Sequence, residues 1–174
     1  MLAVSLGAPA EGPASGQGIR NPIMIVAGFS EVPPAIDWVS RLLVEGPPRV
    51  TFVHIIDTNI FMRGFEAGGS SLVELIGDAE RDGKQILETL RTLAPESMSV
   101  TTRLLKAPLS LTAQIMHLIA EVPCCDAVVV CTHAGVIGLG STARTIRRLR
   151  AKSSVPVVVL DEGPRACRAV LYSR

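Results

Sequence analysis

The sequence predicts an α/β fold in which an open, mainly parallel sheet carries helices on both faces. Three observations lead to this prediction. Short apolar runs alternate along the chain with segments of helical periodicity. Most of these runs lack the polar alternation of a strand with one face in water, which is typical of strands buried on both faces. Finally, 174 residues with 48% hydrophobic and 19% charged side chains are enough to bury a core as a single domain.

This domain is predicted to span residues 22–174, after a leader over residues 1–21. The leader is rich in Gly, Ala, Pro and Ser, a composition that predicts flexibility, and it lacks the basic start and apolar stretch of a signal peptide. The net charge of +1 gives no general reason to expect binding to nucleic acid or to an anionic membrane. The apolar runs are also too short to span a bilayer. We therefore expect a cytoplasmic protein with neither a nucleic-acid nor a membrane partner.

The first half of the domain contains two predicted strands with a helix between them. The strands are the apolar runs PIMIVA (residues 22–27) and VTFVHIID (residues 50–57). The helix is predicted from the proline pair at 33–34, a typical helix start, and from one apolar face. That face consists of Ile36, Val39 and Leu43.

The connection over residues 58–70 is long and unusually apolar for a surface loop. Long loops in compact domains are often functional, which favours a lid or a contact with a protein partner. Local packing onto the core explains the same composition equally well, so both interpretations stay open. The large apolar residues of this connection are Ile60, Phe61, Met62 and Phe65.

The second half continues the alternation of helix and strand. Ser71 and Glu74 form a capping-box pattern at the start of a long helix that Pro95 ends. The run SVTTRLL (residues 99–105) is predicted as a third strand near an edge, and a helix is expected over residues 110–121. The inner faces of these two helices consist of Leu72, Leu75, Ile76, Ala79, Ile86, Leu90 and Leu93, and of Leu111, Ile115, Leu118 and Ile119.

The last segments are two apolar strands and a third that follows a tight turn. The strands are DAVVVC (residues 126–131) and VPVVVL (residues 155–160), and the turn is DEGPR. The final segment, ACRAVLY (residues 166–172), is predicted to pair antiparallel with VPVVVL. This pairing covers an exposed apolar edge, either within one subunit or by exchange between two.

No catalytic or metal-binding constellation is visible in the sequence. The four cysteines form no C-x-x-C pair and the three histidines are scattered, so we expect reduced thiols, structural histidines and no metal site. Walker A and nucleophile-elbow motifs are absent. The protein is therefore predicted not to be an enzyme.

A glycine-rich turn connects the fourth and fifth strands and is the main candidate for ligand binding. It contains Gly135, Gly138 and Gly140, followed by Ser141 and Thr142 at the start of a helix. Exposed amides and the helix dipole can bind an anion there. An ordinary helix start with Ser141 or Thr142 as N-cap has the same sequence, and because caps outnumber ligand sites we favour it.

The helix after this turn carries a basic face without acidic residues. A solvated face explains it better than an anionic partner, because no aromatic residues are interleaved. Thr142, Ile146, Leu149 and Ser153 are expected to face inward. The basic residues are Arg144, Arg147, Arg148, Arg150 and Lys152.

Three stretches together resemble the universal stress protein family. IVAGFSE is similar to the family's first strand end, VTFVHIID to its second strand, and VVCTHAG with VPVVVL to its G-x-H-G turn and closing strand. The resemblance covers roughly residues 22–161 in the family's order and spacing. It implies a flavodoxin-like sheet of five strands in the order 3-2-1-4-5, dimerisation through the last strand and, in one subgroup, ATP binding.

The positions that mark the ATP-binding subgroup have changed in this chain. Its G-x2-G-x9-G-[ST] motif falls on Cys131, Ala134, Ala143 and Arg144, and its aspartate after the first strand is Gly28. Added Cβ atoms hinder a close approach of backbone to phosphate, and Gly28 has no carboxylate. We therefore expect ATP binding to be weak or absent. The candidate ligand-binding residues that remain are Gly28, Ile55, Gly135, Gly138, Gly140, Ser141 and Thr142.

The favoured function is that of a non-enzymatic stress-response or regulatory protein without a cofactor. We expect it to act as a homodimer through the C-terminal edge strand and through a protein partner at residues 58–70. One alternative is a sensor that binds ATP or another adenine nucleotide at the Gly135–Thr142 turn. A lower-ranked alternative is a dinucleotide-binding oxidoreductase fragment, because GLGSTA fits G-x-G-x-x-[GA] with Asp161 about 20 residues further on.

Overall fold

The protein folds around a single twisted sheet, as expected. The computed structural model describes residues 18–42, 48–58, 71–107, 110–133, 139–163 and 166–172, with the backbone alone at 133, 139–143, 161–163 and 166–172. The strand order is β3-β2-β1-β4-β5-β6. The strands are β1 (Pro22–Ile25), β2 (Arg49–Asp57), β3 (Ser99–Ala107), β4 (Ala127–His133), β5 (Val157–Gly163) and β6 (Ala166–Tyr172).

The strand pairing confirms the predicted topology. The first five strands are parallel in the order 3-2-1-4-5, with β3 at one edge. β6 pairs antiparallel with β5 of the same chain along its whole length, from Val157 opposite Tyr172 to Gly163 opposite Ala166. The apolar edge of β5 is therefore covered within one subunit.

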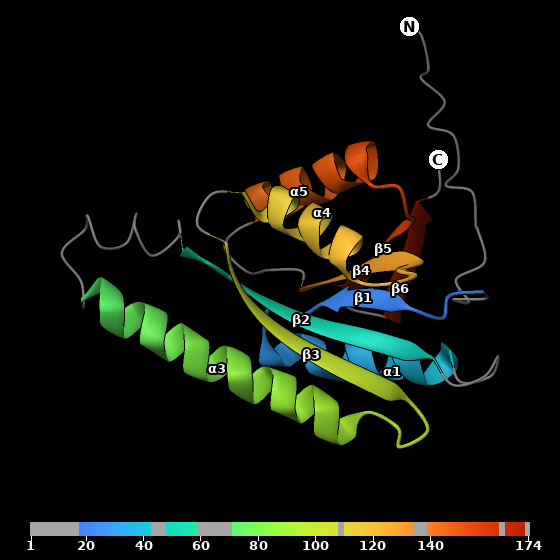
Figure 1. The fold of residues 1–174 in the computed structure, drawn as a ribbon, viewed down its shortest axis with the longest axis horizontal. Helices are drawn as coiled ribbons and strands as arrows, with labels where there is room; N and C mark the ends of the chain where they lie inside the picture. Colours follow the sequence, from blue (N-terminus) through green and yellow to red (C-terminus); the bar gives the residue numbers. More distant parts are fainter. Residues whose placement is uncertain are drawn as a thin grey trace, which may run out of the picture.

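Helices cover both faces of the sheet, and Figure 1 shows the two layers. α1 and α3 pack on one face and α4 and α5 on the other. A short 3-10 helix, η1, connects β1 to α1. The bounds are η1 (Phe29–Glu31), α1 (Val32–Leu42), α3 (Leu72–Leu93), α4 (Leu111–Glu121) and α5 (Leu139–Lys152).

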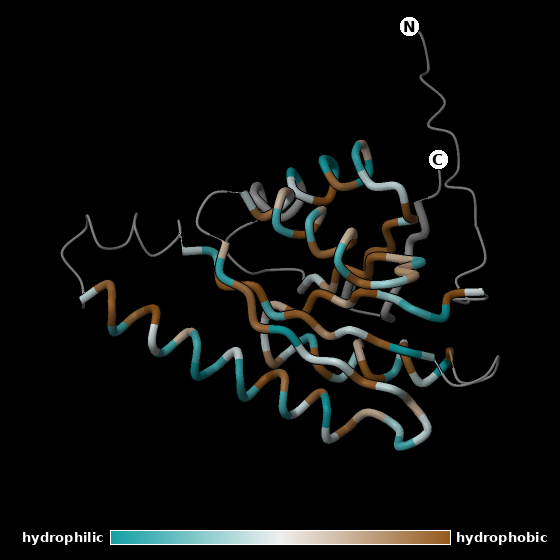
Figure 2. The backbone as a smooth tube through the Cα atoms, in the orientation of Figure 1, coloured by the Kyte–Doolittle hydropathy of each residue, from teal (hydrophilic) through white to brown (hydrophobic). Residues whose placement is uncertain are grey.

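The side chains of β1 and of Val26, the residue after it, alternate between two cores, which explains why this run shows no polar alternation. Met24 and Val26 belong to the core under α1 and α3, whereas Ile23 and Ile25 belong to the core under α4 and α5. All four side chains are at most 7% exposed. The tube in Figure 2 is accordingly brown along the central strands. Trp38, on α1, is 4% exposed and packs in the first of these cores.

Side chains cap two helices, and the first of these caps is the one that the sequence predicts. The Ser71 hydroxyl accepts a hydrogen bond from Glu74 N at 3.3 Å, and the Glu74 carboxylate accepts one from Ser71 N at 3.2 Å. This is the complete capping box. At the start of α4, the Ser110 hydroxyl accepts a hydrogen bond from Ala113 N at 3.3 Å.

The predicted apolar stripe of α3 is only partly buried. Ile86 and Leu90 are 3% and 0% exposed, but Leu93 is 53% exposed. Leu72, Leu75, Ile76 and Ala79 are half-buried, apart from the deep core. Figure 1 shows the reason, because the first turns of α3 extend beyond the end of the sheet.

The end of the predicted leader is attached to the sheet. The Asp126 carboxylate, just before β4, accepts hydrogen bonds from Arg20 N at 2.5 Å and Asn21 N at 2.9 Å. Arg20 O accepts one from Arg49 N at 2.8 Å. The fold therefore takes in residues 20 and 21, and residues 1–17 lie outside the described part. None of the helices described has the length and apolarity that crossing a membrane requires.

Candidate functional site

The carboxyl ends of β1, β2 and β4 meet at one edge of the sheet, where ligands bind in folds of this kind. Ile25 pairs with Val53 on one side and with Val130 on the other. Gly28 follows Ile25 by three residues, Ile55 follows Val53 by two, and α5 follows the end of β4. The structure thus brings Gly28, Ile55 and the first turn of α5 to the same edge. Gly135 and Gly138 lie outside the described residues.

The backbone at Gly28 does not require glycine. Its φ of −153° and ψ of 171° are extended, and any residue adopts them. A Cβ built there meets only the Ser30 hydroxyl oxygen, at 3.9 Å. The edge therefore has room for the aspartate that the resemblance places here, and its loss is not imposed by packing.

A buried carboxylate lies beside Gly28, and sequence reasoning did not single it out. Glu31, the last residue of η1, is 7% exposed, and its Oε2 accepts a hydrogen bond from Ala27 N at 2.5 Å. Glu31 N in turn donates to Gly28 O at 3.2 Å. The Glu31 carboxyl group therefore already occupies the Ala27 N–H, which is not free to bind a phosphate at this strand end. A glutamate in a short turn gives no sequence signal of such burial.

The start of α5 corrects the predicted helix cap. The helix begins at Leu139, so Ser141 and Thr142 lie in its first turns rather than at the N-cap. Gly140 is likewise inside the helix. The first N–H groups of any helix lack intrahelical acceptors, so this turn still presents backbone donors at the carboxyl end of β4.

The basic face of α5 is arranged as predicted where its side chains are described. Leu149 is 0% exposed and Ser153 is 4% exposed, and Ile146 packs against the core. Arg144, Arg147, Arg148 and Lys152 are exposed. The side chain of Thr142 lies outside the description.

His54 is a packed structural residue. Its Nδ1 lies 2.9 Å from Val26 O, and since a carbonyl only accepts, Nδ1 carries the proton and donates. Burial of the ring holds the pKa of His54 below its ordinary value. On its other side the ring lies under Gly83 of α3. His117 is exposed and lies 3.0 Å from the Glu121 carboxylate, and the side chain of His133 is not described.

The cysteines that are described carry free thiols, as expected. Cys124, with a φ of 55°, is exposed, and Cys131 is buried. Burial raises the pKa of Cys125 to about 11, which keeps this thiol protonated. Among the residues that the structure covers, no group of His, Cys, Asp and Glu could hold a metal ion. Cys167 lies outside that set.

Comparison with known proteins identifies the fold. No protein-family model matches the sequence, and no curated protein matches it. A solved protein of the universal stress protein family from Burkholderia pseudomallei is similar in structure, with a TM-score of 0.61 and 15% identity over 86% of this chain and 98% of that one.

Two further solved structures agree with this result. The hypothetical protein MJ0577 has a TM-score of 0.56 and 19% identity, over 83% of this chain and 96% of its own. The universal stress protein UspA from Lactobacillus plantarum has a TM-score of 0.50 and 14% identity, over 80% and 96% of the two chains. The chain therefore has the fold of the universal stress proteins, as its sequence resemblance predicts.

Proposed function

We propose that this protein is a non-enzymatic regulatory protein of the stress response that acts as a homodimer through β6. The observation that carries the proposal is the position of β6 as the last strand of the sheet. Its one partner strand among the described residues is β5. The opposite edge of β6 therefore presents N–H and C=O groups that can pair with a second chain.

The two edges of the sheet differ in how well they are protected. β3 carries Arg103 and Lys106, which form ion pairs with Glu121 at 2.8 Å and with Glu80. Charged residues of this kind discourage pairing with another sheet. β6 has the sequence ACRAVLY, in which Arg168 is the only charge. Two copies related by a two-fold axis would pair their β6 strands antiparallel and form one continuous sheet.

The residues at the carboxyl ends of β1, β2 and β4 support regulation without a bound nucleotide. Gly28 supplies no carboxylate for ribose or adenine, and the Glu31 carboxylate occupies the amide of Ala27. Both features disfavour a nucleotide phosphate at the end of β1.

Contact with a protein partner is proposed for the carboxyl ends of the same strands. The connection at residues 58–70, with its predicted role in a lid or partner contact, lies outside the described residues. It leaves β2 at the carboxyl edge, where Phe29 is 46% exposed on η1. Replacing Phe61 and Phe65 together by Ser should weaken partner binding and leave the melting temperature unchanged. A large fall in melting temperature would instead show that these residues pack on the core.

Two proline variants test the dimer. Neighbouring N–H groups of a strand point to opposite edges, so one of Val170 and Leu171 donates toward β5 and the other outward. Proline removes the N–H group. We expect one of Val170→Pro and Leu171→Pro to keep the wild-type melting temperature and to sediment as a monomer. The other should melt at a lower temperature. A stable variant that remains dimeric would refute pairing through β6.

An adenine-nucleotide sensor is the second candidate. The first turn of α5 lies at the carboxyl end of β4, where its backbone N–H groups can face a phosphate. The position of Asp161 disfavours the dinucleotide alternative. Asp161 lies inside β5, paired with Thr132 and Arg168, rather than at the strand end as a ribose-binding acid would.

A further inference from the structure

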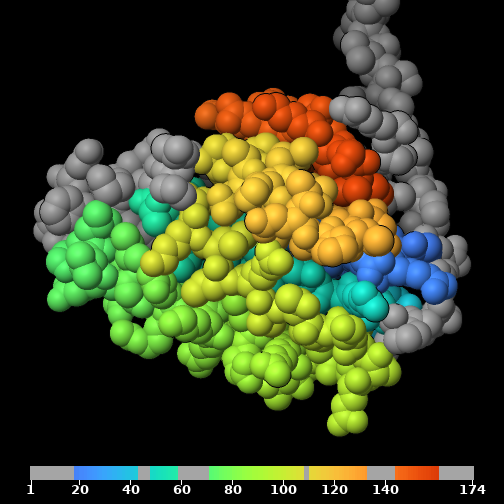
Figure 3. All heavy atoms as spheres, in the orientation of Figure 1, coloured from blue at the N-terminus to red at the C-terminus, as the bar shows by residue number. Residues whose placement is uncertain are grey.

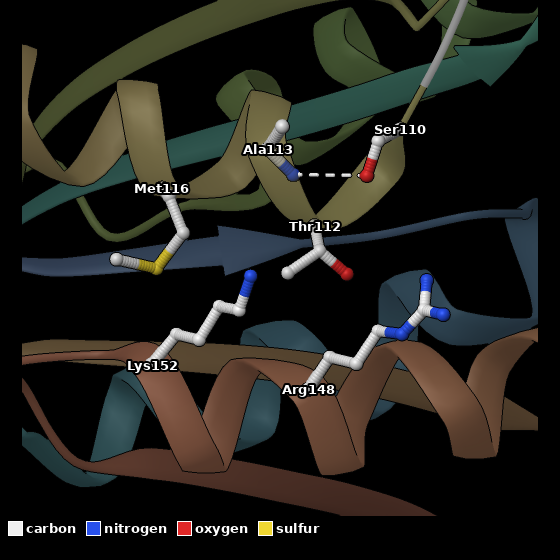
Figure 4. A pocket seen from close by; sticks show the side chains of 6 residues that line it. All are labelled: Ser110, Thr112, Ala113, Met116, Arg148 and Lys152. Carbon is white, nitrogen blue, oxygen red and sulfur yellow. Dashed lines mark hydrogen bonds between the residues drawn. The ribbon is translucent and has the colours of Figure 1, made fainter.

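We propose that a groove between α4 and α5 binds the phosphate group of a small phosphate monoester. The groove has a volume of about 520 Å³. Figure 3 shows α5 running alongside α4 on the face in view, and Figure 4 shows the lining side chains. None of them belongs to the candidate residues at the carboxyl edge. They are Ser110, Thr112, Ala113, Met116, Arg148 and Lys152.

One wall of the groove is the N-terminus of α4. Ser110 caps the helix by accepting a hydrogen bond from Ala113 N, and Leu111 and Thr112 are its first helical residues. The N–H groups of such residues have no acceptor within the helix, and the helix dipole adds partial positive charge. The first turn of α4 contains no acidic residue that would compete for these groups.

Thr112 adds a hydrogen-bonding group between the two walls of the groove. The residue is 6% exposed, and within the described structure no hydrogen bond satisfies its hydroxyl. The hydroxyl oxygen is not among the buried atoms without a partner in the described structure, so it is open to the groove and can donate to a ligand there. Figure 4 shows this hydroxyl pointing into the space between the two helices, on the side of Arg148. A phosphate oxygen in that space would accept its hydrogen bond.

The opposite wall supplies positive charge. Arg148 and Lys152 lie one turn apart on α5, and in the described part of the chain neither forms an ion pair. Like charges at this spacing repel each other. Figure 4 shows both side chains reaching toward the space in front of α4. A phosphate dianion between them would relieve the repulsion and give charge-assisted hydrogen bonds.

The size and lining of the groove indicate more than inorganic phosphate. Pockets for small organic ligands have volumes of about 300–1,000 Å³, a range that includes this one. Met116 adds an apolar surface beside Lys152. The phosphate is therefore expected to be an ester of a small apolar or aromatic group.

Titration of the full chain with phenyl phosphate and with inorganic phosphate tests the site. We expect both to bind, and phenyl phosphate to bind more tightly because its ring contacts Met116. Thr112→Val and Lys152→Gln should each weaken phenyl phosphate binding about tenfold, as loss of a hydrogen bond to a charged group does. Arg147→Gln is the matched control, an exposed cation on α5 outside the groove, and should change binding by no more than about twofold.

The unliganded variants separate binding from folding. Thr112→Val is nearly isosteric and removes no hydrogen bond within the described structure, so its melting temperature should stay close to that of the wild type. Wild-type protein that binds neither phosphate compound at millimolar concentration would overturn the proposal. So would a Thr112→Val variant that binds as tightly as the wild type. An equal loss in Arg147→Gln and Lys152→Gln would show general charge attraction instead of a site.

Discussion

Replacing Gly83 by Ala should destabilise the protein although the residue lies inside a helix. In the middle of an exposed helix this change stabilises by about 1 kcal/mol, because glycine has the greater backbone entropy to lose. At Gly83 the added Cβ would lie 2.6 Å from His54 Cδ2 and 2.7 Å from Leu104 Cδ1. Ordinary van der Waals contact begins at 3.4 Å.

The size of the effect follows from which neighbour can move. The His54 ring is held by the hydrogen bond of Nδ1 to Val26 O, so only Leu104 can shift easily. Overpacking of a tight interior costs about 1–3 kcal/mol, which exceeds the gain in helix propensity. With the gain of about 1 kcal/mol subtracted, we expect a net loss of up to about 2 kcal/mol in the free energy of unfolding.

Gly77 on the same helix provides the matched control. A Cβ there meets nothing within 4 Å, so Gly77→Ala should stabilise by about 1 kcal/mol. Urea unfolding followed by circular dichroism measures both variants, and the melting temperature should shift by about 2–4 °C per kcal/mol. If Gly83→Ala proved as stable as Gly77→Ala, the His54 ring would not pack tightly against Gly83 of α3, which would contradict this account.

Three further predictions concern the carboxyl edge, His54 and the thiols. Calorimetry with Mg-ATP should show no binding tighter than about 100 μM, and a low-micromolar constant would favour the nucleotide sensor. The lowered pKa of His54 means that the unfolded chain binds the proton more readily, so stability should fall as the pH drops below about 6.5. His54→Asn keeps a donor for Val26 O and should lack this part of the pH dependence, as urea unfolding at several pH values would show. Finally, maleimide at pH 8 should modify Cys124 in the Cys125→Ser variant much faster than Cys125 in the Cys124→Ser variant, because burial raises the pKa of Cys125 to about 11. Equal rates would contradict the burial of Cys125.

The fold was predictable because its signals are local. Apolar runs marked the buried strands, and the capping box at Ser71 marked the start of α3. Each signal depends on residues a few positions apart, so it can be recognised in the sequence without knowledge of the tertiary structure. The order of the strands came from the family resemblance, and the pairing of β6 with β5 came from a tight turn between two short apolar segments.

The sites were harder to predict because they depend on long-range packing. The start of α5 was misplaced because several small polar residues and glycines near Leu139 suit an N-cap equally well. Burial of Glu31 depends on how η1 folds back over the end of β1. The groove has Thr112 and Arg148 in its lining only because α4 packs against α5. No local pattern records such an arrangement.

The central claim is that this chain works as a homodimer without a bound nucleotide. Native mass spectrometry of freshly purified full-length protein tests both halves of the claim at once. We predict a species of twice the 18.4 kDa of one chain, with no adenine nucleotide attached. A monomer at about 50 μM, where a dimer of micromolar affinity would be mostly assembled, would contradict the proposed role of β6. A copurified adenine nucleotide would instead contradict the argument from Gly28 and Glu31.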